Sequence, residues 1–342
     1  MDKIAFIDLW FHKKTKSSIF FQDILKKYFD ISVFYEDSVF YLNETKKYIN
    51  WNYDKYVFWQ VIPNFLDLIK IKDKEIILIP MYDGLPLYKI SWERYKCFKI
   101  KIICFCRKVY DFFNDMWFEC FYLQYYLPPL KYDVDYSNKK IFFWYRWNIT
   151  WENVKTIIWN QNVSITIKNN PDPWHNVLKL SEDDIKKYNV VFLNKFFDTK
   201  EEYFEHMAKH SIFIAPRKQE WIWMSFLEGM SMWQCIIAYN DATMDEYIVD
   251  NENGILTKFD WEIILDKYAE MWKNAKLKYE SWFTEWNNKI ESCIIFINSS
   301  YNKICKKITL YDYIIDILVR TMRFIYFSIA FIKNLYHIRI SK

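Results

Sequence analysis

Two glutamates eight positions apart, Glu220 and Glu228, bracket the start of an expected helix in the segment EWIWMSFLEGM. A short apolar strand and the basic pair Arg217 and Lys218 come just before them. The free N–H groups and the positive dipole end of a helix start suit a phosphate. Glu228, in the second helical turn, is placed to accept hydrogen bonds from ribose hydroxyls, and Glu220 can reach whatever the phosphate carries. On spacing alone, a strand and a helix with ordinary solvated charges is the alternative explanation.

Strand-like and helical patterns alternate along most of the chain. Runs such as KIAFIDLW and EIILIPMYD alternate with helical patterns such as SSIFFQDILKKYF, and the alternation restarts at KIFFWYRW after a stretch with two prolines. Such alternation predicts βαβ units in mostly parallel sheets, which bind ligands at the C-terminal ends of their strands. The sequence therefore predicts an α/β fold with two doubly wound domains facing across a cleft, followed by a helical C-terminal tail.

We expect four segments. Residues 1–130 form the N-terminal domain, 131–140 a linker, 141–297 the second domain, and 298–342 a basic helical tail. From Tyr301 onward, eight Lys/Arg and two Asp give the tail a charge of +6, which leaves −2 for the rest of a chain of net charge +4. The apolar run FIYFSIAFI in the tail is too short to span a bilayer. Two placements stay open for the tail: packing back across the first domain, or lying in the interface of an anionic membrane.

Composition excludes several classes of protein. Hydrophobic residues make up 52% and charged residues 26% of the chain, which is typical of a folded globular protein rather than a disordered one. The small net charge does not indicate nucleic-acid binding. Seven cysteines without a C-x-x-C pair predict reduced, mostly buried thiols in a cytoplasmic protein. The basic tail makes the inner membrane face a candidate peripheral contact. The histidines of HMAKH lack the glutamate of a zinc motif, so His206 and His210 are expected on a solvated helix face.

The segment around Glu220 resembles the signature of the GT-B glycosyltransferases of the large retaining family 4. That family usually has E-G-[FI]-G-x-x-x-x-E-A-M, then a glycine, an apolar strand and a downstream E-x-I…G-x-L. The matching residues in this chain are Glu220, Ile222, Glu228, Gly229, Met230, the run CIIA, Glu246, Ile248, Gly254 and Leu256. The resemblance covers the C-terminal half, whereas the N-terminal half matches only in its alternation. It implies a GT-B fold of two Rossmann-like domains.

The resemblance also implies an activity. The chain would be a hexosyltransferase-type enzyme (EC 2.4) that moves a sugar, with retention, from a nucleotide-diphosphate sugar to a saccharide or lipid-linked acceptor, in cell-envelope polysaccharide synthesis. No protein nucleophile is expected, because the leaving diphosphate oxygen is thought to assist deprotonation of the acceptor. The protein would position the substrates and stabilise the departing charge. Neither a cofactor nor a metal ion is expected, since no suitable acidic D-x-D motif occurs.

The same resemblance assigns site residues. The expected catalytic residues are Glu220, which would hold the donor sugar, and Arg146, which matches an arginine that binds the donor diphosphate. The position of a second basic residue holds Thr150, which weakens the site unless Lys155, Arg217 or Lys218 compensates. The expected donor-binding residues are Arg217, Lys218, Trp221, Trp223, Met224, Ser225, Glu228, Thr243 and Glu246.

The chain differs from the family by one recurrent replacement: tryptophan is present at positions where the family has glycine. It has three glycines and 17 tryptophans, although average usage of roughly 7% predicts about 24 glycines. The positions concerned are Trp10, Trp117, Trp221, Trp223, Trp233, Trp272 and Trp282, while Trp286 falls where the family itself often has tryptophan. Trp117 follows a helix at a position that favours the left-handed conformation. We infer a gene whose UGA codons encode glycine. If the tryptophans are genuine, the alternative is a catalytically inactive GT-B-fold binding or assembly subunit.

Overall fold

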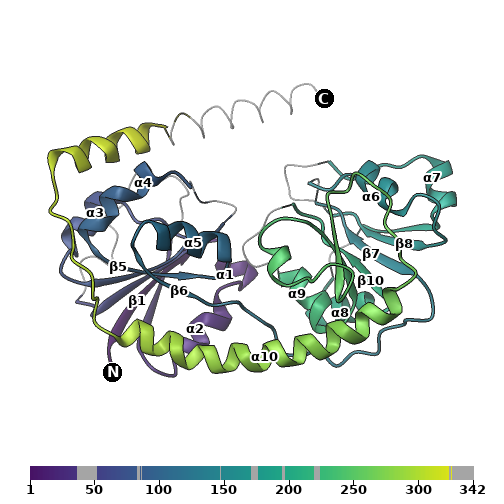
Figure 1. The fold of residues 1–342 in the computed structure, drawn as a ribbon, viewed down its shortest axis with the longest axis horizontal. Helices are drawn as coiled ribbons and strands as arrows, with labels where there is room; N and C mark the ends of the chain where they lie inside the picture. Colours follow the sequence, from purple (N-terminus) through teal and green to yellow (C-terminus); the bar gives the residue numbers. More distant parts are fainter. Residues whose placement is uncertain are drawn as a thin grey trace. The chain divides into compact units, whose positions relative to one another are not determined.

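The computed structural model describes residues 1–36, 52–82, 85, 87–146, 148–170, 176–194, 197–218, 224–322 and 325 (Figure 1). The chain divides into two compact units. The first unit comprises Met1–Cys104, Val109–Tyr122 and Ser292–Lys342, and the second comprises Phe105–Lys108 and Leu123–Glu291. Each unit is built on a six-stranded sheet whose paired strands are all parallel. The predicted α/β class, with two doubly wound sheets, is confirmed.

The sheet of the first unit has the strand order β2-β1-β3-β4-β5-β6. Its strands are β1 (Lys3–Leu9), β2 (Asp30–Glu36), β3 (Lys55–Trp59), β4 (Glu75–Ile79), β5 (Lys99–Cys104) and β6 (Glu119–Tyr122). Its helices are α1 (His12–Thr15), α2 (Ile19–Leu25), α3 (Phe65–Lys70), α4 (Lys89–Glu93), η2 (Arg94–Cys97) and α5 (Arg107–Asp115). Every residue of β3 and all but the first of β4 are buried, as expected of parallel strands covered on both faces.

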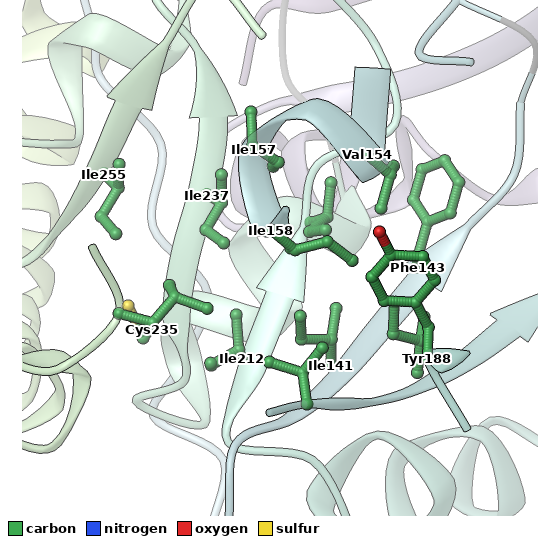
Figure 2. Packing of buried hydrophobic residues seen from close by; sticks show 14 of the residues in the cluster. Ile141, Phe143, Val154, Ile157, Ile158, Tyr188, Ile212, Cys235, Ile237 and Ile255 are labelled. Carbon is green, nitrogen blue, oxygen red and sulfur yellow. The ribbon is translucent and has the colours of Figure 1, made fainter. Parts of the chain in front are cut away.

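The sheet of the second unit has the strand order β12-β11-β10-β7-β8-β9. Its strands are β7 (Lys140–Trp144), β8 (Ser164–Lys168), β9 (Val190–Leu193), β10 (Ile212–Ile214), β11 (Cys235–Tyr239) and β12 (Gly254–Thr257). Its helices are α6 (Trp151–Ile158), α7 (Glu182–Lys187), α8 (Lys200–Ala208), α9 (Met224–Ser231) and η3 (Met244–Glu246). Figure 2 shows Ile141, Ile212 and Ile237 from three neighbouring strands in one buried cluster with Ile157 and Ile158 of α6.

A 31-residue helix, α10 (Tyr268–Asn298), carries the chain from the second unit back to the first. Its end is held by Lys101, a fully buried residue of β5 whose Nζ donates to the backbone carbonyls of Phe296, at 2.9 Å, and Ser299. A cation suits these carbonyls because they form the negative end of the helix dipole. Glu75 then accepts a hydrogen bond from the backbone N–H of Tyr301 at 2.8 Å. None of the helices in the described ranges is both long and apolar enough to cross a bilayer.

Two tryptophans adopt the left-handed backbone conformation. Trp117 has φ 63° and Trp233 has φ 65°. At each, the tryptophan N–H bonds to the carbonyl three residues back, and the next N–H bonds to the carbonyl five residues back. This is the Schellman helix ending, whose left-handed position is usually glycine. The left-handed conformation predicted at Trp117 is confirmed, and Trp233 after α9 shares it; the inference that glycine is encoded stays a prediction.

His210 does not lie on a solvated helix face as the sequence analysis expected. Because α8 ends at Ala208, His210 leads into β10 and is buried against the ring of Phe142, at 5.3 Å between centroids. Its Nδ1 lies 2.9 Å from the carbonyl oxygen of His206, and its Nε2 lies 2.7 Å from Oγ1 of Thr166. A neutral imidazole satisfies both contacts, since Nδ1–H donates to the carbonyl and Nε2 accepts from the hydroxyl.

We expect His210 to make the second unit sensitive to acid. Burial lowers the pKa of His210 to about 4, well below its ordinary value. Because the folded-state pKa is the lower one, the neutral histidine contributes stability above pH ~6.5 that is lost as the pH falls towards 4, up to about 3 kcal/mol. Urea unfolding across this pH range measures the loss. The variant His210→Gln should lose less stability over the same range, and an equal loss in this variant would contradict the role of His210.

Candidate functional site

Charged residues follow three neighbouring strands of the second sheet. Lys168 is the last residue of β8, Arg146 comes two residues after β7, and Arg217 comes three residues after β10. Strand β7 pairs in parallel with both β10 and β8, so the three C-terminal ends lie along one edge of the sheet. Ligands of doubly wound sheets bind at this edge. It is therefore the candidate site.

Glu228 is a buried carboxylate beside this edge, in the second turn of α9. Its Oε1 lies 3.1 Å from Nζ of Lys200, the first residue of α8. Burial raises the pKa of Glu228, and the positive charges of Lys200 and Lys168 act against that rise. The carboxyl group is thus almost removed from water, and two lysines favour its charged form. The side chain of Lys200 is more than half exposed, with 56% of its surface accessible.

Lys168 lies among aromatic side chains. Its Nζ lies 3.6 Å from the ring centroid of Trp144, 5.0 Å from that of Tyr203 and 5.1 Å from that of Phe197. The guanidinium carbon of Arg146 lies 4.9 Å from the same Trp144 ring. Aromatic faces attract cations, so the indole holds both positive charges near each other. Burial, reinforced by the charge of Arg146, lowers the pKa of Lys168 to about 8.

The sequence analysis missed Lys168 and Lys200. A signal for Lys168 was available, because the residue ends the strand that follows the one ending near Arg146. No comparable signal points to Lys200, whose contact with Glu228 joins two helices 28 positions apart through the folding of the unit.

The start of α9 supplies further polar groups. Met224 is half-buried and Ser225 is buried, and the Ser225 hydroxyl finds no hydrogen-bond partner within the residues that the structure describes. Gly229 packs tightly, since a Cβ there would meet side-chain atoms of Gln234 and Ile236 at 3.0 Å. The predicted residues Glu220, Trp221 and Trp223 lie outside the described residues.

Several solved structures have a similar fold. HepE from Anabaena, in complex with UDP and glucose, matches with a TM-score of 0.56 and 12% identity over 86% of this chain and 99% of that one. A glycosyltransferase from Rickettsia africae matches with a TM-score of 0.57 and 12% identity over 87% and 99%. Sucrose-phosphate synthase from Thermosynechococcus elongatus matches with a TM-score of 0.50 and 11% identity over 96% and 100%. The chain has the GT-B fold. No family model and no curated protein matches its sequence.

Within this GT-B fold, the basic residues after β10 differ in environment. Arg217 is half-buried, whereas Lys218 is exposed and its Nζ lies 5.4 Å from the ring centroid of Tyr239 in β11. Both residues follow β10, which lies between β7 and β11 in the sheet, so both lie at the candidate edge. Their predicted contacts with a donor stay a prediction.

The other two positions considered for a second basic residue serve the local fold. Thr150 caps the N-terminus of α6, where its hydroxyl accepts from the backbone N–H of Asn153. Lys155 lies 2.8 Å from a carboxylate oxygen of Glu152 and 3.2 Å from one of Asp184. Since acidic partners already hold Lys155, the geometry favours Lys168 as the second cation beside Arg146.

The loop that contains Thr243 and Glu246, predicted to contact the donor, is held by hydrogen bonds to other segments of the chain. Thr243 is buried just before η3, and the half-buried Glu246 ends that helix. The Glu246 carboxylate accepts from the backbone N–H of Arg107 at 2.7 Å, and the Gln124 side chain donates to the Glu246 carbonyl at 2.8 Å. These contacts give Glu246 a structural role beside the donor contact that the sequence predicts.

The first unit has a buried polar network at the C-terminal end of β1. Both carboxylate oxygens of the fully buried Asp8 are bonded, one to His12 Nδ1 and one to the Ser18 hydroxyl, each at 2.5 Å. The Gln22 side chain donates to the same hydroxyl at 2.9 Å. The network ties α1 and α2 to β1, and none of its members is among the site residues predicted from the sequence.

Proposed function

We propose that this chain is a glycosyltransferase (EC 2.4) that uses a nucleotide-diphosphate sugar as donor. The observation that carries the proposal is the buried Glu228 at the sheet edge where Arg146 and Lys168 converge on Trp144. A carboxylate with two nearby cations suits a ligand that has both hydroxyl groups and phosphates. The likeness in fold to HepE, solved with UDP-glucose, supports the same donor class.

In this proposal each part of the donor has its own partners. The diphosphate is bound by Arg146 and Lys168, with Arg217 and Lys218 as further cations and the N–H groups of α9 as donors. Glu228 accepts hydrogen bonds from the ribose, and Glu220 holds the donor sugar. The remaining donor contacts come from residues 221 and 223 and from Met224, Ser225, Thr243 and Glu246.

The proposed reaction breaks the bond between the anomeric carbon and the diphosphate oxygen and forms a bond from that carbon to an acceptor oxygen. The acceptor proton passes to the leaving diphosphate. We propose retention of configuration and a hexosyl donor, as in family 4, with no metal ion or cofactor. The proposed acceptor is a saccharide or lipid-linked saccharide of envelope polysaccharide synthesis, and the tail brings peripheral membrane contact. The cations contribute by stabilising charge on the leaving group, which is worth several kcal/mol in such sites.

We expect nucleotide affinity to fall about tenfold between pH 7 and 9. The pKa of Lys168 is lowered to about 8, so the cation is largely charged at pH 7 and largely neutral at pH 9, and the neutral amine does not attract a diphosphate. Calorimetric titration of UDP, GDP and ADP at both pH values measures the effect. This titration uses the glycine form of the protein, which carries Trp221→Gly, Trp223→Gly and Trp233→Gly.

Lys168→Arg is the matched control, because arginine stays charged throughout this range. It should remove most of the pH dependence, whereas Lys168→Met should bind weakly at both pH values. No binding of any of the three nucleotides by the glycine form would contradict the proposed function, and equal affinity at pH 7 and 9 would contradict the role of Lys168.

A further inference from the structure

The C-terminal helix, which begins at residue 310 and is described to residue 322, turns a polar side towards its own unit. Asp312 and Asp316 are both buried. Asp316 accepts from Nε of Arg94 at 3.2 Å, and Asp312 pairs with Lys306 at 2.8 Å. The helix runs beside α3 and α4 (Figure 1), and the ring of Tyr313 on it meets Phe65 of α3 edge-on at 5.6 Å. The Arg94–Asp316 pair, the Tyr313–Phe65 contact and the buried Ile315 hold this helix in place.

The opposite side of the same helix is apolar and exposed. The exposed side chains recur at spacings of three and four residues, so they form a single stripe. We call this the outward stripe, and its members are Leu310, Tyr311, Ile314, Ile317, Leu318 and Met322, of which between 46% and 76% of the surface is accessible. A surface helix normally turns its apolar stripe to the core. Here the buried side of the helix is a different one, formed by Asp312, Ile315 and Asp316, so packing of the unit does not explain the stripe.

The charged residues in and beside this helix indicate what kind of partner covers the outward stripe. Between residues 310 and 325 the only acidic residues are Asp312 and Asp316, and both are buried and paired. Arg320 lies at the margin with 40% of its side chain exposed, and it pairs with Asp316 at 2.8 Å, so Arg94 and Arg320 share one carboxylate and leave a positive charge over. Lys307 is exposed just before the helix. The outward side therefore offers apolar groups and positive charge without a negative one. Two copies packed stripe to stripe would bring like charges together, whereas an anionic lipid surface complements them.

We propose that the outward stripe is a docking surface for an anionic lipid bilayer. The helix lies in the bilayer interface, its apolar side inserted below the headgroups and its cations among them, as interfacial helices do. The Arg94–Asp316 pair and the buried Ile315 keep the stripe turned away from the unit. It rests on the proposed function in one respect, since it names the residues that make the membrane contact of the tail. It does not depend on the sugar chemistry, because none of these residues belongs to the donor site.

Vesicle flotation with the full chain tests the proposal. We expect the chain to float with vesicles of phosphatidylglycerol and phosphatidylcholine, much less with phosphatidylcholine alone, and less at high salt. Ile314→Asp with Leu318→Asp should lower binding by about tenfold or more, since both side chains leave the lipid and repel its charge. Val191→Asp with Leu277→Asp, at exposed apolar positions of the second unit, is the matched control and should float as the unmodified chain.

Three results would overturn the proposal. They are failure of the unmodified chain to float, unchanged flotation of the Ile314→Asp, Leu318→Asp variant, and self-association in sedimentation that this variant abolishes. The last would assign the stripe to a second copy. Because both residues are exposed, the melting temperature should not change; if the aspartates lower it, Ile314→Ser with Leu318→Ser replaces them and should still lower binding.

Discussion

Glu228→Gln lowers kcat/KM for the preferred nucleotide sugar by about a hundredfold, the effect expected when charged hydrogen bonds to a bound hydroxyl are lost. Glutamine keeps the shape of the side chain but replaces one acceptor oxygen by a donor group. The fold should survive the change. Burial already raises the pKa of Glu228, so a neutral side chain is tolerated there, and Lys200 is exposed enough to be solvated without its partner.

The control for this experiment is Glu201→Gln, which removes an exposed carboxylate from the first turn of α8. It should leave kcat/KM of the glycine form unchanged. If Glu228→Gln retains full activity at an unchanged melting temperature, the carboxylate is not a substrate contact. A fall in melting temperature with proportionate loss of activity would assign Glu228 a structural role only.

Trp117→Gly raises the free energy of unfolding by about 1 kcal/mol, because a left-handed conformation costs a residue with a side chain roughly 1–2 kcal/mol that glycine avoids. The Trp117 side chain is 80% exposed, so little packing is lost when it is removed. Urea unfolding measures the difference. By contrast, Trp286→Gly should destabilise by about 3–5 kcal/mol, since Trp286 is buried with its ring 4.9 Å from that of Tyr125.

The codons of the gene give a second test of which tryptophan positions are really glycine. If UGA encodes glycine, the codons for Trp117 and Trp233 are UGA and the codon for Trp286 is UGG. Peptide masses of the protein from its native cells should then show glycine at 117, 221, 223 and 233. UGG codons at Trp221, Trp223 and Trp233 would refute the inference and favour the inactive binding subunit.

Local pattern was enough to predict the layers of this fold but not its electrostatics. The strands around KIAFIDLW and CIIAYN were visible because parallel strands buried on both faces are continuous apolar runs. Arg146 and Glu228 were found through a resemblance, and the structure brings both to one sheet edge. Lys168 was missed because its chemistry comes from Trp144 of β7 and Tyr203 of α8, which lie around it only in the folded unit.

The errors have similar causes. His210 was expected in water because its neighbours in sequence are charged, yet the end of α8 at Ala208 turns it into the core. The placement of the tail was left open between two alternatives, because its orientation depends on Arg94, more than 200 positions away, which binds Asp316. Pairings across such distances follow from topology rather than from any periodic pattern.

The most direct test of the central proposal is release of nucleoside diphosphate from a panel of UDP-, GDP- and ADP-sugars by the glycine form. We predict that at least one donor is turned over, with release accelerated by a saccharide acceptor and nearly lost in Glu228→Gln. Tight binding of a nucleotide sugar without release from any donor, with or without acceptor, would contradict an enzymatic role and leave a binding subunit with the GT-B fold.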